Sequence, residues 1–175
     1  MPHEGLIYIN SGGTAHQLAI RLPREIRAQI VTDSLSAASV IASELELPVY
    51  FIGGKIDPIT LASDASWNGY PLDELHWDVA FIGVEAIDLT EGMTASYVDI
   101  THDSLIVKRS AKVVALCDSS KFGRVSNVSV GSISDIDVLI SDNALSPETV
   151  EELTAIGVAV ELAGPTDEQD QEGRQ

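Results

Sequence analysis

The sequence predicts an α/β fold in which a mostly parallel β-sheet is flanked by helices. Short aliphatic runs recur along the 175 residues, and most are followed by a stretch with helical spacing. Hydrophobic residues make up 45% of the chain but aromatic residues only 5%, which is typical of buried parallel strands. Glycines and small polar residues follow most of the aliphatic runs. The length suits one domain with a substantial core, which we expect to span residues 1–162.

The aliphatic runs define the order of the elements. Helical spacing predicts helices at residues 15–22 and 35–45, and a third that ends near residue 109. Ser146 and Pro147 are typical of an N-cap and a first helical position, and Gly157 ends that helix. Residues 85–94 read as a polar loop, and the charged residues 163–175 as a disordered tail. Strands are predicted at residues 6–9, 29–32, 47–52, 77–82, 112–117, 128–130, 137–140 and 158–160.

The loop after the first strand is the strongest candidate for a binding site. It consists of Asn10, Ser11, Gly12, Gly13 and Thr14, between a strand and a helix. Glycines let a ligand approach the backbone, and the first N–H groups of a helix have no intrahelical partner. A phosphate or another small anion would suit such a loop. The alternative is a tight strand-to-helix turn with Thr14 as N-cap.

Similar residues follow the other predicted strands. Because parallel strands end at one edge of a sheet, these loops are expected to converge on one pocket. Taken singly, each is also compatible with ordinary turn chemistry. The candidate ligand-binding residues beyond the first loop are Thr32, Ser34, Gly53, Gly54, Gly83, Glu85, Asp88, Asp118 and Lys121.

Charge and composition exclude several functions. The net charge of −17, with four lysines, predicts that this chain alone does not bind DNA. The chain has no signal peptide and no apolar run long enough to span a membrane, so we expect a soluble cytoplasmic protein. Cys117 is the single cysteine and excludes an internal disulfide. The four histidines are scattered without ligand spacing, so we expect neither a metal nor a cofactor.

A set of short strings resembles the effector-binding domain of the DeoR family of bacterial sugar-metabolism repressors. The resemblance runs from about Gly5 to about Val160, and DSSKFG is its most specific string. It implies a Rossmann-like fold related to ribose-5-phosphate isomerase type A and the coenzyme A transferases. The strings, in order, are INSGGTAHQLA, VTDSL, YFIGGK, DVAFIGVEAID, GMT, SAKVVALCDSSKFGR and SDIDVLISD.

The resemblance also implies a function and a homo-oligomer. The domain would sense a phosphorylated sugar or polyol, with its phosphate on the first loop, helped by Thr32 and Ser34. Asp118 and Lys121 match the family's DxSK string, and Gly83, Glu85 and Asp88 match the loop after the fourth strand. The family's opening is usually Asp-Ser-Gly-Thr-Thr, from which Asn10, Gly13 and Ala15 depart. The winged helix-turn-helix that normally precedes the sensor is absent from this sequence.

Two other functions are compatible with the sequence. A sugar-phosphate isomerase of the same fold would need a general acid or base, which Glu85, Asp88 or Lys121 would supply. Such isomerases also carry a long glycine-rich loop after the acidic one, whereas this chain has only Gly92 there. A purely structural or oligomerisation module would leave the converging polar loops without a use. We therefore favour the sensor.

Overall fold

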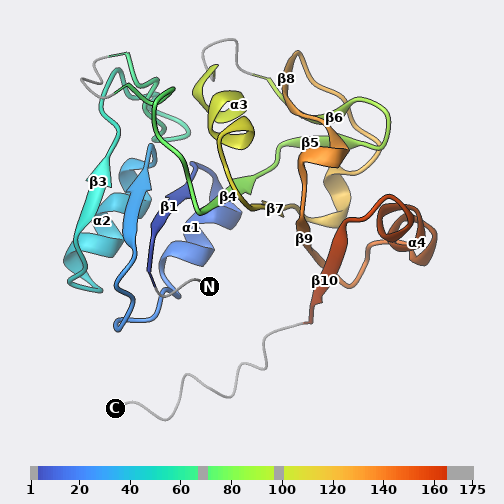
Figure 1. Cartoon of the computed structure of the whole chain (residues 1–175), viewed down its shortest axis with the longest axis horizontal. Helices are drawn as coiled ribbons and strands as arrows, with labels where there is room; N and C mark the ends of the chain where they lie inside the picture. Colours follow the sequence, from blue (N-terminus) through green and yellow to red (C-terminus); the bar gives the residue numbers. More distant parts are fainter. Residues whose placement is uncertain (1–3, 67–70, 97–100, 165–175) are drawn as a thin grey trace.

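A central parallel sheet organises the computed structural model, which describes residues 4–66, 71–96 and 101–164. Within these residues the sheet has seven strands in the order β10-β9-β7-β4-β1-β2-β3, and every neighbouring pair is parallel (Figure 1). The predicted α/β fold with a mostly parallel sheet is thereby confirmed. The strands are β1 (Leu6–Ile9), β2 (Gln29–Thr32), β3 (Val49–Phe51), β4 (Val79–Gly83), β7 (Val113–Leu116), β9 (Val138–Asp142) and β10 (Ala159–Ala163).

Both faces of the sheet are covered, because alternate side chains of each strand point to opposite sides. Ile7 and Ile9 of β1 join one buried cluster and Tyr8 joins the other. The helices α1 (Gly13–Ala19) and α2 (Leu35–Ser43) pack in the first cluster, and α3 (Thr101–Lys108) and α4 (Pro147–Ala155) in the second. Aliphatic strands buried on both faces are the expected consequence of this layering.

A second, smaller sheet lies over the α3 side and corrects one expectation. Residues 85–94 do not form a simple polar loop, because β5 (Ala86–Asp88) and β6 (Gly92–Ala95) pair as an antiparallel hairpin. β6 also pairs with β8 (Val128–Gly131), and the sheet lies beside α3 at the upper right of Figure 1. Gly92 has a φ of 79°, and a Cβ there would collide with the Gly131 carbonyl.

The helix boundaries follow from local chemistry. Ser34 caps α2 by accepting from the Ala37 N–H. Ser146 caps α4 with Pro147 in the first turn, and this cap was predicted. α1 begins at Gly13 rather than Ala15 and ends at Ala19. The chain then forms a tighter, 3-10-type turn before Pro23, in which the Leu22 N–H donates to the carbonyl three residues earlier. Two single 3-10 turns, η1 (Ser119–Lys121) and η2 (Ile133–Asp135), follow β7 and β8.

Two remaining expectations concern the ends of elements and the membrane. β10 includes Ala163, so the chain is ordered as a strand one residue into the predicted tail, and residues 165–175 lie outside the described residues. In the part of the chain that the structure describes, every helix is too short or too polar to traverse a bilayer.

Candidate functional site

A cleft of about 530 Å³ opens at the carboxyl-terminal edge of the sheet. The loops after β1, β4 and β7 meet there, so the predicted convergence of strand ends is present in the fold. The cleft also has a wall from the β5–β6 hairpin and from the start of α3. Its lining from the predicted set comprises Asn10, Ser11, Gly12, Gly13, Thr14, Gly83, Glu85, Asp118 and Lys121.

The loop from Asn10 to Thr14 lines the cleft and leads into α1. Gly12 is the N-cap, with a φ of 123° that favours glycine, and a Cβ there would meet no atom within 4 Å. Gly12 therefore owes its identity to backbone conformation and leaves open space beside the loop. Because Gly12 is the cap, Thr14 is not the N-cap, and the alternative of a Thr14-capped turn does not hold.

Asn10 is buried and ties this loop to the end of β4. Its Oδ1 accepts from the Gly83 N–H at 2.7 Å, and its Nδ2 donates to the Gly83 carbonyl at 3.2 Å. The same Nδ2 lies 3.2 Å from Oδ2 of Asp103, to which it also donates. The side chain of Asn10 thus holds two strand ends and one helix together.

The turn after β7 presents Lys121 to the cleft. Asp118 caps η1 by accepting from the Ser120 N–H at 3.0 Å, and Oδ2 of Asp142 accepts from the Ser119 N–H at 2.9 Å. These contacts fix the turn from both sides. Burial raises the pKa of the neighbouring Cys117 thiol to about 12, so this cysteine is no nucleophile at neutral pH.

Glu85 lies on the hairpin side of the cleft and already has partners. Its Oε2 accepts from the Ser96 N–H at 3.0 Å and from the Ser96 hydroxyl at 2.8 Å. These two bonds anchor the start of the hairpin to the segment that leads out of β6.

Five predicted ligand-binding residues lie outside the lining of the cleft. Thr32 and Ser34 serve the start of α2, since Oγ1 of Thr32 accepts from the Ser34 N–H at 3.0 Å. Asp88 caps the hairpin turn, with Oδ1 accepting from the N–H groups of Thr90 and Glu91. Gly53 and Gly54 follow β3, where a Cβ on Gly54 would collide with the side chain of Asp64. The structure gives Thr32, Ser34, Gly54 and Asp88 an ordinary turn or packing role, whereas a Cβ on Gly53 would meet no atom within 4 Å.

Several lining residues escaped prediction because they come from an irregular segment after β3. Asp57 and Asp64 organise this segment by accepting from backbone N–H groups. The N–H groups of Thr60 and Ile59 lower the pKa of Asp57, and the side chain and then the N–H of Ser66 lower the pKa of Asp64. The only sequence signal was the run of Asp, Ser and Thr itself, which is common in loops. From this segment the lining gains Lys55, Asp57, Thr60, Ser63 and Asp64. Three more polar lining residues outside the predicted ligand-binding set come from elsewhere, namely Asp33 after β2, Thr94 in β6 and Asp103 in α3.

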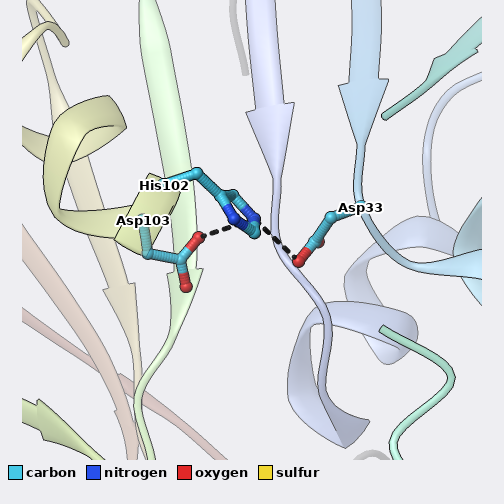
Figure 2. Close-up of side chains that lie close together, drawn as sticks. All are labelled: Asp33, His102 and Asp103. Atoms are coloured by element: carbon cyan, nitrogen blue, oxygen red, sulfur yellow. Dashed lines mark hydrogen bonds and ion pairs between the residues drawn. The ribbon is translucent and has the colours of Figure 1, made fainter. Parts of the chain in front are cut away.

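Asp33, His102 and Asp103 form a buried cluster against the wall of the cleft (Figure 2). Nε2 of His102 lies 3.2 Å from Oδ2 of Asp33 and 3.8 Å from Oδ1 of Asp103. The exposed fractions of the three residues are 2%, 6% and 5%. Spacing along the chain predicts no metal site among the histidines. The fold nevertheless brings His102 next to two carboxylates, one adjacent to it in sequence and one distant.

The protonation of this cluster is shifted by its burial. Desolvation raises the pKa of Asp103 to about 6, and the charge of Asp33 adds to that shift while His102 opposes it. Burial also raises the pKa of Tyr8, whose hydroxyl donates to Oδ1 of Asp103 at 2.9 Å. For His102, burial acts to lower the pKa, but the hydrogen bond to Asp33 and the two negative charges outweigh it and raise the pKa.

Curated proteins similar to this chain are transcriptional regulators. The chain is 30% identical over 156 residues to the HTH-type transcriptional regulator GlpR of Haloferax volcanii, covering 89% of this chain and 61% of the relative. It is 24% identical over 165 residues to the glycerol-3-phosphate regulon repressor of Escherichia coli, covering 93% of this chain and 65% of the relative. The chain thus spans less than two thirds of the length of these proteins.

A solved structure and a protein-family model are also similar to this chain. Ribose 5-phosphate isomerase A from Methanocaldococcus jannaschii matches with a TM-score of 0.48 and 19% identity, over 70% of this chain and 48% of that chain. The sequence model of the DeoR C terminal sensor domain family matches residues 1–143. Since that match covers most of the chain, the protein belongs to the family of DeoR C-terminal sensor domains.

Proposed function

We propose that this chain is the effector-binding domain of a transcriptional regulator of carbohydrate metabolism, and that its effector is a phosphorylated sugar or polyol. Membership of the sensor family supports a sensing role. The printed name of the Escherichia coli relative, a glycerol-3-phosphate regulon repressor, supports a phosphorylated polyol or sugar. DNA recognition would belong to a part of the regulator outside this chain, whose net charge of −17 disfavours binding to DNA phosphates. Such a regulator would act in the cytoplasm.

The main support is that the loop Ser11–Thr14 and Lys121 line the same cleft from different strand ends. The first N–H groups of α1 have no intrahelical partner, and Ser11 and Thr14 line the same cleft. An effector phosphate would bind this loop through backbone and hydroxyl donors. Lys121 would neutralise part of its charge from the turn after β7.

The carboxylates of the cleft would bind the hydroxyl groups of the effector. Asp118 uses Oδ1 for Ser120, and a sugar hydroxyl would donate to its Oδ2. Glu85 is held by Ser96 through Oε2, and its Oε1 would accept in the same way. Carboxylates accept but do not donate when ionised, so they favour polyhydroxylated ligands.

Effector binding becomes a signal only if two states of the regulator differ in affinity for the effector. A homo-oligomer would provide such states. The edge strand β3 supports self-association, because Tyr50 and Phe51 on it are exposed hydrophobic residues and no other described strand pairs with that edge of the sheet.

One observation favours the isomerase alternative. Asp103 lines the cleft, and its pKa of about 6 suits a general base near neutral pH. Against it, the curated relatives are regulators, Asp88 lies outside the cleft and Glu85 is held by Ser96. We therefore favour sensing without turnover.

An NMR time course separates the two functions. Pentose and hexose phosphates are incubated with the wild-type chain, and the aldose and ketose signals are followed. We expect no conversion above the uncatalysed rate, while ligand line widths show saturable binding. Conversion that disappears in the Asp103→Asn protein would establish an isomerase and overturn the sensor.

A further inference from the structure

The buried cluster of Asp33, His102 and Asp103 has no part in the proposed effector contacts. Its members come from two elements, with Asp33 directly after β2 and the other two in the first turn of α3. One ligand atom from each residue can be chosen so that all three lie within 4.8 Å of one another. Figure 2 shows the Asp33 and Asp103 carboxylates on opposite sides of the His102 ring.

The cluster contains polar atoms that the surrounding protein does not satisfy. Oδ1 of Asp33 and Nδ1 of His102 are buried and have no hydrogen-bond partner among the described residues. Leaving a buried carboxylate oxygen without a partner costs free energy, more than a neutral group would. Asp103, in contrast, is held by Tyr8 at Oδ1 and by Asn10 at Oδ2. Of the four carboxylate oxygens around the imidazole, Oδ1 of Asp33 is thus the one left without a donor among the described residues.

We propose that Asp33, His102 and Asp103 bind a divalent transition-metal cation of the Zn²⁺ class. Ligand atoms around a tetrahedral Zn²⁺ are roughly 3.3–3.6 Å apart, given metal–ligand bonds of about 2.0–2.2 Å. The separations of 3.2 and 3.8 Å from Nε2 of His102 to the two carboxylates bracket this range. Tyr8 and Asn10 orient Asp103 as outer partners orient metal-binding carboxylates.

The donor set also determines which cation fits. An imidazole nitrogen with two carboxylates suits Zn²⁺, Co²⁺ or Ni²⁺, whereas Mg²⁺ prefers oxygen ligands and retains its water. Because both carboxylates line the cleft, a fourth coordination position would be reachable from it for water or a small molecule. The site is defined by the protein alone, so it stands or falls independently of the effector.

The test is a metal titration of the purified chain after chelator treatment and dialysis, without any sugar. Co²⁺ binding is followed by visible absorption and Zn²⁺ binding by calorimetry, both in millimolar Mg²⁺. The Mg²⁺ occupies weak sites on the acidic surface. We expect one equivalent of Co²⁺ to bind, with intense absorption bands of low coordination number, and Zn²⁺ to displace it.

Three variants locate the site. Asp33→Asn and His102→Gln each remove a donor and should weaken Zn²⁺ binding at least tenfold, since even outer partners contribute that much. Asp73→Asn makes the same charge change at an exposed position outside the cleft and should bind as the wild type does. Circular dichroism verifies that each variant is folded.

Two results would overturn the site. One is weak binding of many metal equivalents by the wild-type chain, without intense Co²⁺ bands. His102 would then be a buried core histidine held by hydrogen bonds and not a metal ligand. The other is a folded Asp33→Asn or His102→Gln protein with unchanged Zn²⁺ affinity. If both variants fail to fold, the wild-type Co²⁺ spectrum and stoichiometry decide alone.

Discussion

At the scale of single residues, Asn10 shows how one amide organises the cleft. It donates to the Gly83 carbonyl and to Asp103 and accepts from the Gly83 N–H, so every part of the amide is engaged. Asp is the residue that the DeoR resemblance leads one to expect at this position. Here it would set a third carboxylate beside Asp103 and near Asp33. Asparagine therefore fits the buried acidic cluster better than aspartate does.

The Asn10→Asp variant should be less stable than the wild type by about 1–3 kcal/mol at neutral pH. It loses the Nδ2 donor to Gly83 and Asp103 and brings a negative charge to within hydrogen-bond distance of another. The free energy of unfolding is measured by urea denaturation in the presence of EDTA, because a bound cation would offset the added charge.

Asn143→Asp is the matched control, since it makes the same change at an exposed position. Its midpoint should stay close to that of the wild type. An Asn10→Asp protein that unfolds at the wild-type urea concentration would show that the hydrogen bonds of Asn10 contribute no net stability.

At the scale of elements, the turn after β7 positions one of the lysines of the cleft. Asp118 and Asp142 hold η1 by accepting from its backbone N–H groups. These bonds set the position of Lys121, the last residue of η1. Lys121 follows β7, and the loop Ser11–Thr14 follows β1. These two strands are the neighbours of β4 on either side. The two elements thus frame the proposed phosphate position.

Replacing Lys121 by alanine should weaken the binding of a phosphorylated ligand by about 1.5–3 kcal/mol, the range for a hydrogen bond to a charged group. Binding of the corresponding unphosphorylated sugar should change little. Lys112→Ala, at an exposed position outside the cleft, is the matched control. Equal losses in the two variants would indicate a general charge effect and would contradict a direct contact from Lys121.

The parallel sheet was predictable because its strands are continuous aliphatic runs, such as Val113–Leu116, and each leads into a turn or helix. The small sheet was not. β5 has only three residues and pairs with β6, and β6 pairs in turn with β8, which begins at Val128, far along the chain. Periodicity carries no information about such pairing, so residues 85–94 read as a loop.

The candidate site likewise contains residues that the sequence could predict and residues that it could not. Strand-end residues such as Ser11 and Lys121 were predictable because parallel strands end at one edge of the sheet. Asp88 and Ser34 also lie at the ends of strands, but their side chains cap a turn and a helix instead. Asp33 and His102 are 69 residues apart in sequence, and nothing local in the chain signals their contact.

At the scale of the whole molecule, the net charge of −17 sets the conditions for any anionic ligand. The surface repels phosphate at long range, and a binding site must overcome that repulsion locally. Lys55 and Lys121 both line the cleft, so half of the chain's four lysines gather there. Six acidic residues line the same cleft, so a phosphate bound there would depend on these two lysines to neutralise its charge.

The most direct test is a calorimetric titration of the wild-type chain at about 0.15 M salt, where charges beyond roughly 8 Å are screened. The ligands are glycerol 3-phosphate and a panel of triose, pentose and hexose phosphates, each beside its unphosphorylated parent. We predict saturable binding of at least one phosphate at one molecule per chain, with its parent at least tenfold weaker. If no phosphate in the panel binds, or if the parents bind as tightly, the proposal that this cleft senses a phosphorylated sugar or polyol is contradicted.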